Sequence, residues 1–318
     1  MTRLLITGAT GFLGGPAVRA AADVFEVHAA ARSPGERRGV SPPVDRDARQ
    51  EVSFHSCDLL NANEAVRLIE DVRPTHLLHL AWIATPGAYW TSPENHRWVD
   101  ASKRLLLAFA RCGGTRAVVA GTCAEYDWTA AGVCREAATP LRPHTTYGRC
   151  KLELGEWAAA LGRARGVRVA WARLFWMYGP REHPARLVPA VARALLAGTP
   201  AACSAGTQER DFLHVEDVAG ALVALTRSDL TGPVNVGSGE PVAVRTVVAR
   251  VAEACGRPDL VRLGARATPA NEPPLLTADV SRLRDELGWR PRTELSAGLR
   301  DTVNWWRAGG TEGVRECA

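Results

Sequence analysis

The chain has 318 residues, of which 46% are hydrophobic and 23% charged, and its net charge is +5. This composition predicts a globular protein and excludes the disordered and fibrous classes. Arginine is spread along the chain among acidic residues, so the charge does not form the basic stripe of a nucleic-acid-binding protein and we expect no such partner.

Apolar runs typical of buried strands alternate along the chain with stretches of helical periodicity. The opening residues, MTRLLITGATG, enter the first run directly with no leader-peptide pattern. No apolar stretch reaches the roughly 20 residues of a membrane span, so we expect a cytoplasmic protein with no membrane partner. The alternation predicts an α/β fold, a doubly wound parallel sheet of the Rossmann type. The runs lie at 3–7, 25–31, 53–59, 76–81, 117–122 and 168–174.

After residue 175 the elements become shorter and are separated by Gly and Pro, which predicts a smaller, mixed α/β C-terminal lobe. A strand-like run at 233–238 is expected to return to the large sheet. We therefore expect one domain over 1–175 with a return segment at about 214–240, and a second lobe over 176–213 and 241–318. Residues 33–50, rich in Pro, Gly and charge, predict a surface loop.

Residues 7–14, TGATGFLG, place three glycines directly after the first strand, at the start of a helix. Gly8 allows a tight turn, Gly11 lets the backbone approach a pyrophosphate, and Gly14 lets helix and strand touch. The helix N-terminus then faces the phosphates. The segment predicts a dinucleotide site, and it also brings Phe12 and Leu13 to the cofactor.

The second strand ends in AAARS, where a site for NAD would carry an acidic residue that holds the ribose hydroxyls. Ala31 takes that place and Arg32 follows it, with Ser33 next. An arginine can pair with a 2'-phosphate, so the segment favours NADPH (NADP+) as the cofactor. The alternative is that Arg32 opens a solvated loop.

Tyr147 and Lys151 stand four residues apart, on one face of a predicted helix. The tyrosine pKa is ordinarily near 10, and a neighbouring ammonium is expected to lower it, which would make the pair an acid/base unit. Thr122 ends the strand at 117–122, where ligands gather in open α/β sheets. Its hydroxyl is expected to hold the oxygen that gains or loses the proton.

These segments follow one another in the order seen in a known family. They are TGATGFLG, HLAW (79–82), a Thr four residues before Tyr126, YGRCK, RLFWMYGP (173–180), QERDFLHVEDVA (208–219) and NVGSGEP (235–241). The chain resembles, along nearly its whole length, the extended short-chain dehydrogenases that act on nucleotide sugars. Among them it most resembles the reductases of 4-keto-6-deoxyhexoses.

The resemblance implies a dinucleotide-binding domain followed by a substrate-binding lobe, a nucleotide-diphosphate sugar as substrate, and a homodimer through helices at 94–112 and 145–164. It also implies site residues. The catalytic set is Thr122, Tyr147 and Lys151. Cofactor contacts would come from Asp58, Leu59, Leu80, Ala81 and Trp82, and substrate contacts from Cys123, Ala124, Trp176, Arg186 and Arg210.

Structural alternatives stay open for several of these residues. Asp58 would also serve as the N-cap of the following helix. Arg210 and Asp211 would also form a surface ion pair, and Arg186 an unpaired surface charge. Cys123 fits a small buried residue better than an active-site acid. For three tryptophans, core packing competes with a sugar pocket. These are Trp82, Trp90 and Trp98.

The residues after Thr122 bear on the reaction. Dehydratases that resemble this fold carry Asp and then Glu there, to move water out of the sugar, and this chain has Cys123 and Ala124. Since alanine moves no proton, dehydration is disfavoured. NADPH favours net reduction of a C4 ketone in deoxysugar biosynthesis. Two alternatives remain, a 4-epimerase with tightly bound NAD(P) and a non-catalytic dinucleotide-sensing regulator.

The chain also departs from the family in two places. Trp176 stands where many relatives have an asparagine that contacts the nucleotide sugar. The segment ATPANEPP (267–274) lacks an arginine common before a Gly-Glu-Pro segment. The eight cysteines form no Cys-x-x-Cys pair and no zinc-ligand spacing with histidine, so we expect buried free thiols and no metal.

Overall fold

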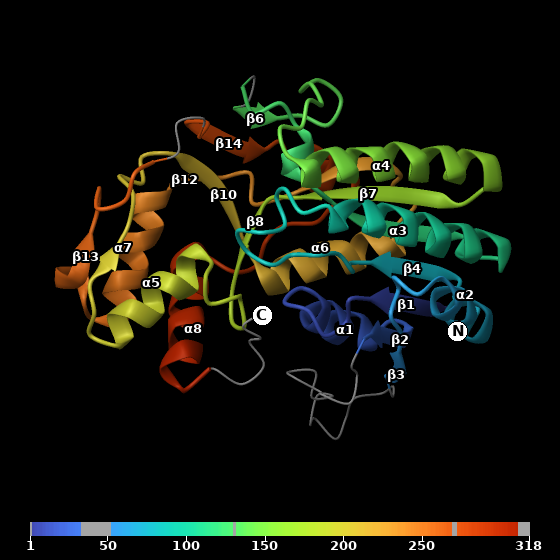
Figure 1. The fold of residues 1–318 in the computed structure, drawn as a ribbon, viewed down its shortest axis with the longest axis horizontal. Coiled ribbons are helices and arrows are strands. Elements are labelled where there is room, and N and C mark those ends of the chain that lie inside the picture. The colour runs from blue at the N-terminus through green and yellow to red at the C-terminus, as the bar shows by residue number, and fades with distance from the viewer. Residues whose placement is uncertain (1, 33–51, 130–131, 269–271, 311–318) are drawn as a thin grey trace.

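The computed structural model describes residues 2–32, 52–129, 132–268 and 272–310. Its centre is a seven-stranded parallel sheet, in which the strands lie in the order β11-β7-β5-β4-β1-β2-β3 (Figure 1). The strands are β1 (Arg3–Thr7), β2 (Glu26–Ala31), β3 (Ser53–Ser56), β4 (His76–His79), β5 (Arg116–Thr122), β7 (Arg168–Leu174) and β11 (Gly232–Val236). The predicted α/β class and the doubly wound parallel sheet are confirmed.

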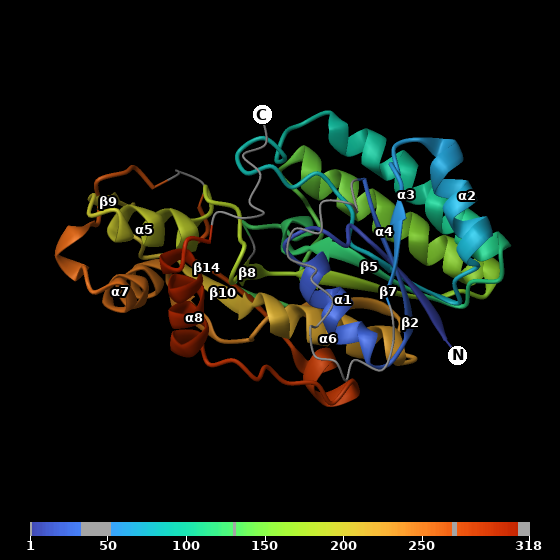
Figure 2. The same ribbon diagram turned by 90° about the horizontal axis from the view of Figure 1, so that it is seen from below.

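Helices cover both faces of this sheet. On one face lie α1 (Gly14–Ala22) and α6 (Val215–Arg227), and on the other lie α2 (Ala62–Val72), α3 (Glu94–Arg111) and α4 (Thr146–Arg165), as Figure 2 shows edge-on. Two apolar clusters fill the two interfaces. The central strands β5 and β7 are buried almost throughout, which explains their unbroken apolar runs.

A second, mixed sheet lies beyond the carboxyl ends of the large one, in the order β12-β10-β14-β6, with β8 paired to β10. Its strands are β6 (Val133–Cys134), β8 (Trp176–Tyr178), β10 (Glu209–His214), β12 (Pro241–Ala243) and β14 (Leu275–Ala278). Three helices, α5 (Leu187–Leu196), α7 (Val244–Cys255) and α8 (Leu295–Arg307), pack with it around a third apolar cluster. The short strands β9 (Ala201–Ala202) and β13 (Val261–Arg262) pair with each other.

The smaller sheet is mixed, because β12 is antiparallel to β10 whereas β14 and β8 are parallel to it. The chain leaves the large sheet after β7 and comes back to it at β11, which pairs with β7. The two sheets therefore meet beside the ends of β5, β7 and β11. The expected surface loop at 33–50 lies outside the described residues.

Candidate active site

Thr122 is the last residue of β5, and its side chain is 7% exposed. The chain turns there into a single 3₁₀ turn at Cys123–Glu125, for which Thr122 is the N-cap. The Thr122 Oγ1 accepts a hydrogen bond from the backbone N–H of Ala124, at 3.2 Å. Because one lone pair is used in this way, the hydroxyl proton is left to donate to another group.

Tyr147 lies in the first turn of α4, whose N-cap Thr145 accepts a bond from the Gly148 N–H at 3.0 Å. Its ring meets the rings of Tyr89 and Trp90 edge-on, with centroids 4.9 and 5.8 Å away. Burial raises the pKa of Tyr147, and a hydrogen bond with Thr122 opposes that rise. The structure thus brings the strand end and the helix start together.

Lys151 follows one turn later and is buried. Its Nζ donates to the Ala120 carbonyl at 2.8 Å and lies 3.8 Å from the centre of the Trp82 ring. The ammonium is 6.0 Å from the Tyr147 ring centre. Burial lowers the pKa of Lys151 to about 7, against the attraction of Glu125.

The sequence had led us to expect that Lys151 lowers the pKa of Tyr147. The structure differs, because the ammonium bonds to the Ala120 carbonyl and rests on Trp82, while the half-buried phenol is held among aromatic rings. Desolvation is therefore the larger influence on Tyr147, and it raises the pKa.

The glycine turn lies between β1 and α1. Gly8 has φ of +71°, and a Cβ on it would lie 2.9 Å from the Ala81 nitrogen. A Cβ on Gly14 would lie 2.0 Å from the Gly8 oxygen, whereas one on Gly11 would meet only that oxygen, at 3.2 Å. Leu13, the N-cap of α1, makes no side-chain capping bond. The N-terminus of α1 follows this turn directly, and the positive end of its dipole suits an anion.

Of the expected adenosine contacts, Arg32 is exposed at the end of β2, and its carbonyl accepts a bond from Ser56 Oγ at 3.2 Å. Ser33 lies outside the described residues. Asp58 is half-buried beyond β3, and Leu59 is buried. Leu80 and Ala81 follow β4 and lie against the glycine turn, whereas Phe12 packs partly buried on the core.

The N-cap alternative for Asp58 is wrong. The cap of α2 is Asn61, whose side chain accepts from the Asn63 N–H at 3.1 Å. Asp58 Oδ1 accepts instead from the Leu60 N–H, at 3.0 Å. Both side chains belong to types that cap helices, and only the backbone geometry decides between them.

On the substrate side, Cys123 and Ala124 are buried beside Thr122, and burial raises the pKa of the Cys123 thiol well above its usual value. Trp176 lies on β8, half-buried, and the Arg210 guanidinium lies over its ring, 5.2 Å from the centre. The Arg186 Nη1 donates to the hydroxyl of Tyr89 at 3.5 Å, so Arg186 is not an unpaired surface charge.

Arg210 and Asp211 do not form a surface ion pair, because both are buried and they bond to different partners. The Arg210 guanidinium pairs with Glu272 and donates to the Glu209 carbonyl at 2.6 Å. Asp211 accepts from the backbone N–H groups of Ser238, at 2.6 Å, and of Gly239 and Ala278, both at 3.0 Å. Neighbours on a strand point to opposite faces, which separates the two side chains.

Tyr89 is the residue that the sequence did not single out. It is 6% exposed, and its ring lies beside that of Tyr147. The guanidinium of Arg186 lies over the Tyr89 ring, 5.2 Å from the ring centre. Among the three tryptophans considered for a sugar pocket, Trp90 stands beside Tyr147, Trp82 beneath Lys151, and Trp98 in the core. The aromatic run AYW at 88–90 was the available signal.

The described ranges hold no group of three His, Cys, Asp or Glu side chains arranged to bind a metal. Nor do they contain a helix long and apolar enough to cross a membrane. Of the cysteines described, five are buried and two are half-buried, and none forms a disulfide; Cys317 lies outside that part of the chain.

Comparison with known proteins shows one family. Residues 4–237 match the model of the NAD dependent epimerase/dehydratase family. The chain is 28% identical to a UDP-glucose 4-epimerase of Azospirillum brasilense, over 96% of this chain and 92% of that protein. It is 27% identical to a dTDP-glucose 4,6-dehydratase of Mycolicibacterium smegmatis, over 96% and 93%. DesIV, a dTDP-glucose 4,6-dehydratase from Streptomyces venezuelae with NAD and TYD bound, matches with a TM-score of 0.84 at 26% identity, over 99% and 100%.

Proposed function

Because the chain belongs to the NAD dependent epimerase/dehydratase family, we propose that it reduces the C4 ketone of a dTDP-linked 4-keto-6-deoxyhexose with NADPH. The relatives named above act on UDP-glucose and dTDP-glucose, which supports a nucleotide sugar as the substrate class. The choice of reduction among the reactions of the family depends on the residues of this chain.

The observation that carries the proposal is the pair of residues after Thr122. A 4,6-dehydratase of this fold needs an acid and a base there. Ala124 has no proton to give, and burial holds the Cys123 thiol neutral by raising its pKa. With no group to move water out of the sugar, the site keeps only the residues that exchange a proton at a single oxygen.

The residues present fit a dinucleotide. The start of α1 after the glycine turn suits the pyrophosphate, and Arg32, exposed just after β2, suits a 2'-phosphate. When bound, reduced nicotinamide supplies the hydride for the carbonyl carbon. The expected contacts from Asp58, Leu59, Leu80 and Ala81 stay part of this proposal.

The chain's own residues handle the proton. Tyr147, whose raised pKa keeps the phenol protonated at neutral pH, donates to the oxygen formed from the ketone. Thr122, whose hydroxyl bonds with Tyr147 here, donates instead to the same substrate oxygen when the sugar is bound. Lys151 lies one helical turn away on the face of Trp82, and its protonated form balances negative charge that develops there.

We assign the diphosphate of the sugar to Arg186 and Arg210, in the lobe over 176–213 and 241–318. Arg210 already bonds to Glu272, so contact with a phosphate requires it to share or exchange that partner.

We also propose a homodimer through α3 and α4. Sedimentation of the purified protein tests that part by its mass.

The experiment follows absorbance of reduced nicotinamide in mixtures of protein, NADPH and nucleotide-linked 4-keto-6-deoxy sugars, with NADH as the control. We expect NADPH to be consumed in equal amount to reduced sugar. If neither NADPH nor NADH is consumed and NMR shows the sugar unchanged, the result would contradict an enzymatic role and favour the non-catalytic regulator.

The second candidate is a 4-epimerase with tightly bound NAD(P). It is favoured by the 28% identity with UDP-glucose 4-epimerase over nearly the whole of both chains. An epimerase returns its hydride, so it consumes no reductant. A changed sugar at constant absorbance in the same experiment would therefore select this function.

A further inference from the structure

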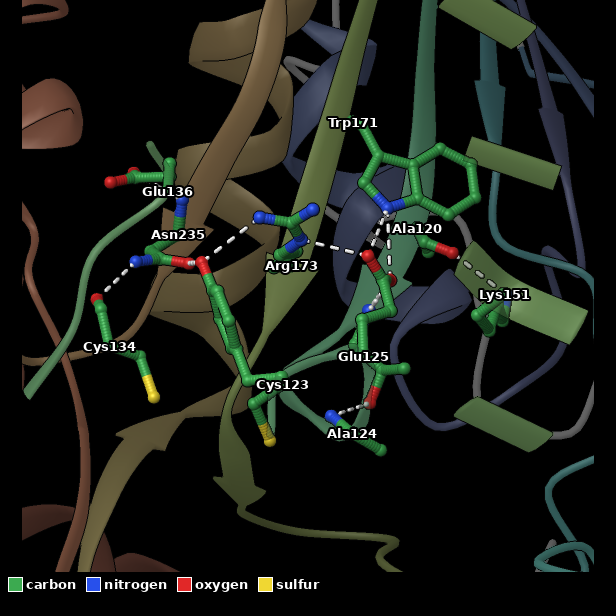
Figure 3. A network of polar contacts seen from close by, with 12 residues as sticks. Ala120, Cys123, Ala124, Glu125, Cys134, Glu136, Lys151, Trp171, Arg173 and Asn235 are labelled. Atoms are coloured by element: carbon green, nitrogen blue, oxygen red, sulfur yellow. Dashed lines mark hydrogen bonds and ion pairs between the residues drawn. The ribbon is translucent and has the colours of Figure 1, made fainter. Parts of the chain in front are cut away.

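Glu125 is a carboxylate enclosed in the protein three residues after Thr122, and its side chain is 0% exposed. A buried charge requires a partner and hydrogen bonds, and the structure supplies both (Figure 3). Arg173 on β7, 5% exposed, donates its Nε to Glu125 Oε2 at 2.8 Å. The Trp171 Nε1 donates to both carboxylate oxygens, at 2.9 and 3.0 Å.

The carboxylate also holds the backbone of Thr122. Glu125 Oε1 accepts from the Thr122 N–H at 2.8 Å, while Thr122 Oγ1 accepts from the next turn, as in a capping box. This reciprocal pair fixes both the position of Thr122 and the direction of its hydroxyl. A cap with the same hydrogen bonds at a helix start is ordinary, but here the cap residue is the one placed at the reacting oxygen.

We propose that Glu125 is a positioning residue for this site, which orients Thr122 and supplies the buried negative charge that balances Lys151. The inference rests on the proposed function, since it takes Thr122, Tyr147 and Lys151 as the working groups.

The charge balance follows from the groups that surround Lys151. Glu125 faces it from the 3₁₀ turn and raises its pKa, against the effect of burial. Tyr147 faces it from α4. His79 faces it from β4, and this imidazole is neutral because burial lowers its pKa to about 3. Trp82 contributes the face of its ring. Of these groups, Glu125 is the one with a carboxyl side chain, and Arg173 pairs with it.

The ion pair is fixed from the second sheet as well. Arg173 Nη1 donates to the Tyr126 hydroxyl at 3.1 Å, and that hydroxyl donates to Asn235 Oδ1 at 2.7 Å. Asn235 Nδ2 donates in turn to the carbonyls of Cys134 and Asp279, at 2.8 and 3.1 Å. Figure 3 shows Glu125, Arg173, Asn235 and Cys134 one after another along this row of contacts.

The space for this arrangement depends on a glycine. A Cβ on Gly121 would lie 2.3 Å from the Trp171 Nε1 and 2.8 Å from the Glu125 Oε1. Only a residue without a side chain lets Trp171 reach the carboxylate. The local sequence, Gly121 before Thr122 and Glu125 after it, is therefore matched to the ion pair.

The first test needs no substrate. The chain has two lysines, Lys103 and Lys151, so protein labelled with ¹³C at lysine Cε gives two signals, and Lys103→Arg assigns them. In Glu125→Gln the hydrogen-bond acceptor stays and the charge is lost. We expect the Lys151 signal to titrate at lower pH than in the wild type. In Glu136→Gln, which changes a group bonded to Asn235 N–H, we expect no shift.

The second test is kinetic. Glu125→Gln should lower kcat by about 10- to 100-fold and leave KM for the sugar near the wild-type value, because orientation and not binding is lost. The alkaline limb of its pH profile should move to lower pH with the Lys151 titration. A purely structural role would lower stability but would leave both the limb and the titration in place.

Glu125→Gln leaves Arg173 buried without its partner, and the variant is expected to lose stability for that reason. The double variant Glu125→Gln/Arg173→Met removes both charges of the pair. Since loss of a neighbouring cation raises a lysine pKa, we expect a smaller downward shift of the Lys151 titration than in Glu125→Gln, with the same loss of kcat. An unshifted Lys151 signal in both variants, or kcat within twofold of wild type, overturns the proposal. A wild type with no turnover but a shifted signal in the variants rejects the proposed function and supports the charge balance.

Discussion

The ammonium of Lys151 rests on the face of Trp82, 3.8 Å from the centre of its ring. Trp82 is itself fixed, because its Nε1 donates to Asn95 Oδ1 at 2.8 Å, and Asn95 Nδ2 donates to the Tyr89 carbonyl at 2.7 Å. The loop that carries Tyr89 is thereby tied to the helix that carries Lys151. A cation held on an aromatic face keeps its place without a carboxylate in contact.

Lys151 should make stability depend on pH. Burial lowers its pKa to about 7 in the folded protein, whereas an unfolded chain holds this proton up to about pH 10.4. Between these values the unfolded state binds more protons, so the free energy of unfolding should rise with pH across the window. Denaturant titrations of the wild type and of Lys151→Met at several pH values measure this dependence of the free energy of unfolding on pH. Equal pH slopes in the two proteins would rule out this contribution.

Tyr147→Phe removes the proposed proton donor and keeps the ring that packs on Tyr89 and Trp90. We expect turnover to fall by about 10²- to 10⁴-fold, the usual size of a general acid's contribution, with NADPH binding unchanged. An activity assay measures turnover, and a titration with NADPH measures cofactor binding. The matched control is Tyr178→Phe, whose hydroxyl donates to the Leu295 carbonyl at 3.4 Å in the second lobe. Wild-type turnover in Tyr147→Phe would reject the assignment.

Much of the fold could be predicted from sequence because buried parallel strands leave an unbroken apolar run. The run at 168–174 coincides with β7, and the run at 117–122 lacks only the first residue of β5. Ends with mixed composition were less well placed. The run at 53–59 overshoots β3, since Cys57 and Leu59 lie beyond the strand but are still buried in an apolar cluster beside the large sheet.

Residues of the proposed site could be named from the sequence where chemistry and short spacing coincide, as with Tyr147 and Lys151, which do lie on one helix. Contacts between distant segments left no such signal. Tyr89 contacts Tyr147 from a loop, and Arg210 on β10 pairs with Glu272, which lies before β14. Glu125 is only three residues from Thr122 in sequence. Its buried ion pair could not be predicted, because the partner Arg173 lies 48 residues later.

Arg32→Ala should remove the preference for NADPH over NADH. A charge-assisted pair with a 2'-phosphate contributes about 1.5–3 kcal/mol, so we expect kcat/KM with NADPH to fall about 10- to 100-fold and that with NADH to stay level. The control is Arg97→Ala, an exposed arginine of α3 that pairs with Glu94. Equal losses with both cofactors would mean that Arg32 does not contact the 2'-phosphate.

Gly148→Ala should separate α4 from the end of β5, and so draw apart the two residues proposed to be catalytic. A Cβ at this position would lie 2.3 Å from the Ala124 carbonyl oxygen, so α4 must move away from the turn after β5. Because Tyr147 precedes Gly148 and Thr122 precedes that turn, the two hydroxyls would draw apart. We expect about a 100-fold loss of kcat, as misplacements near 1 Å cause, with a smaller loss of NADPH binding. The control is Gly132→Ala, whose Cβ would meet nothing within 4 Å. If kcat of Gly148→Ala matched that of Gly132→Ala, close contact between α4 and the end of β5 would not be needed for turnover.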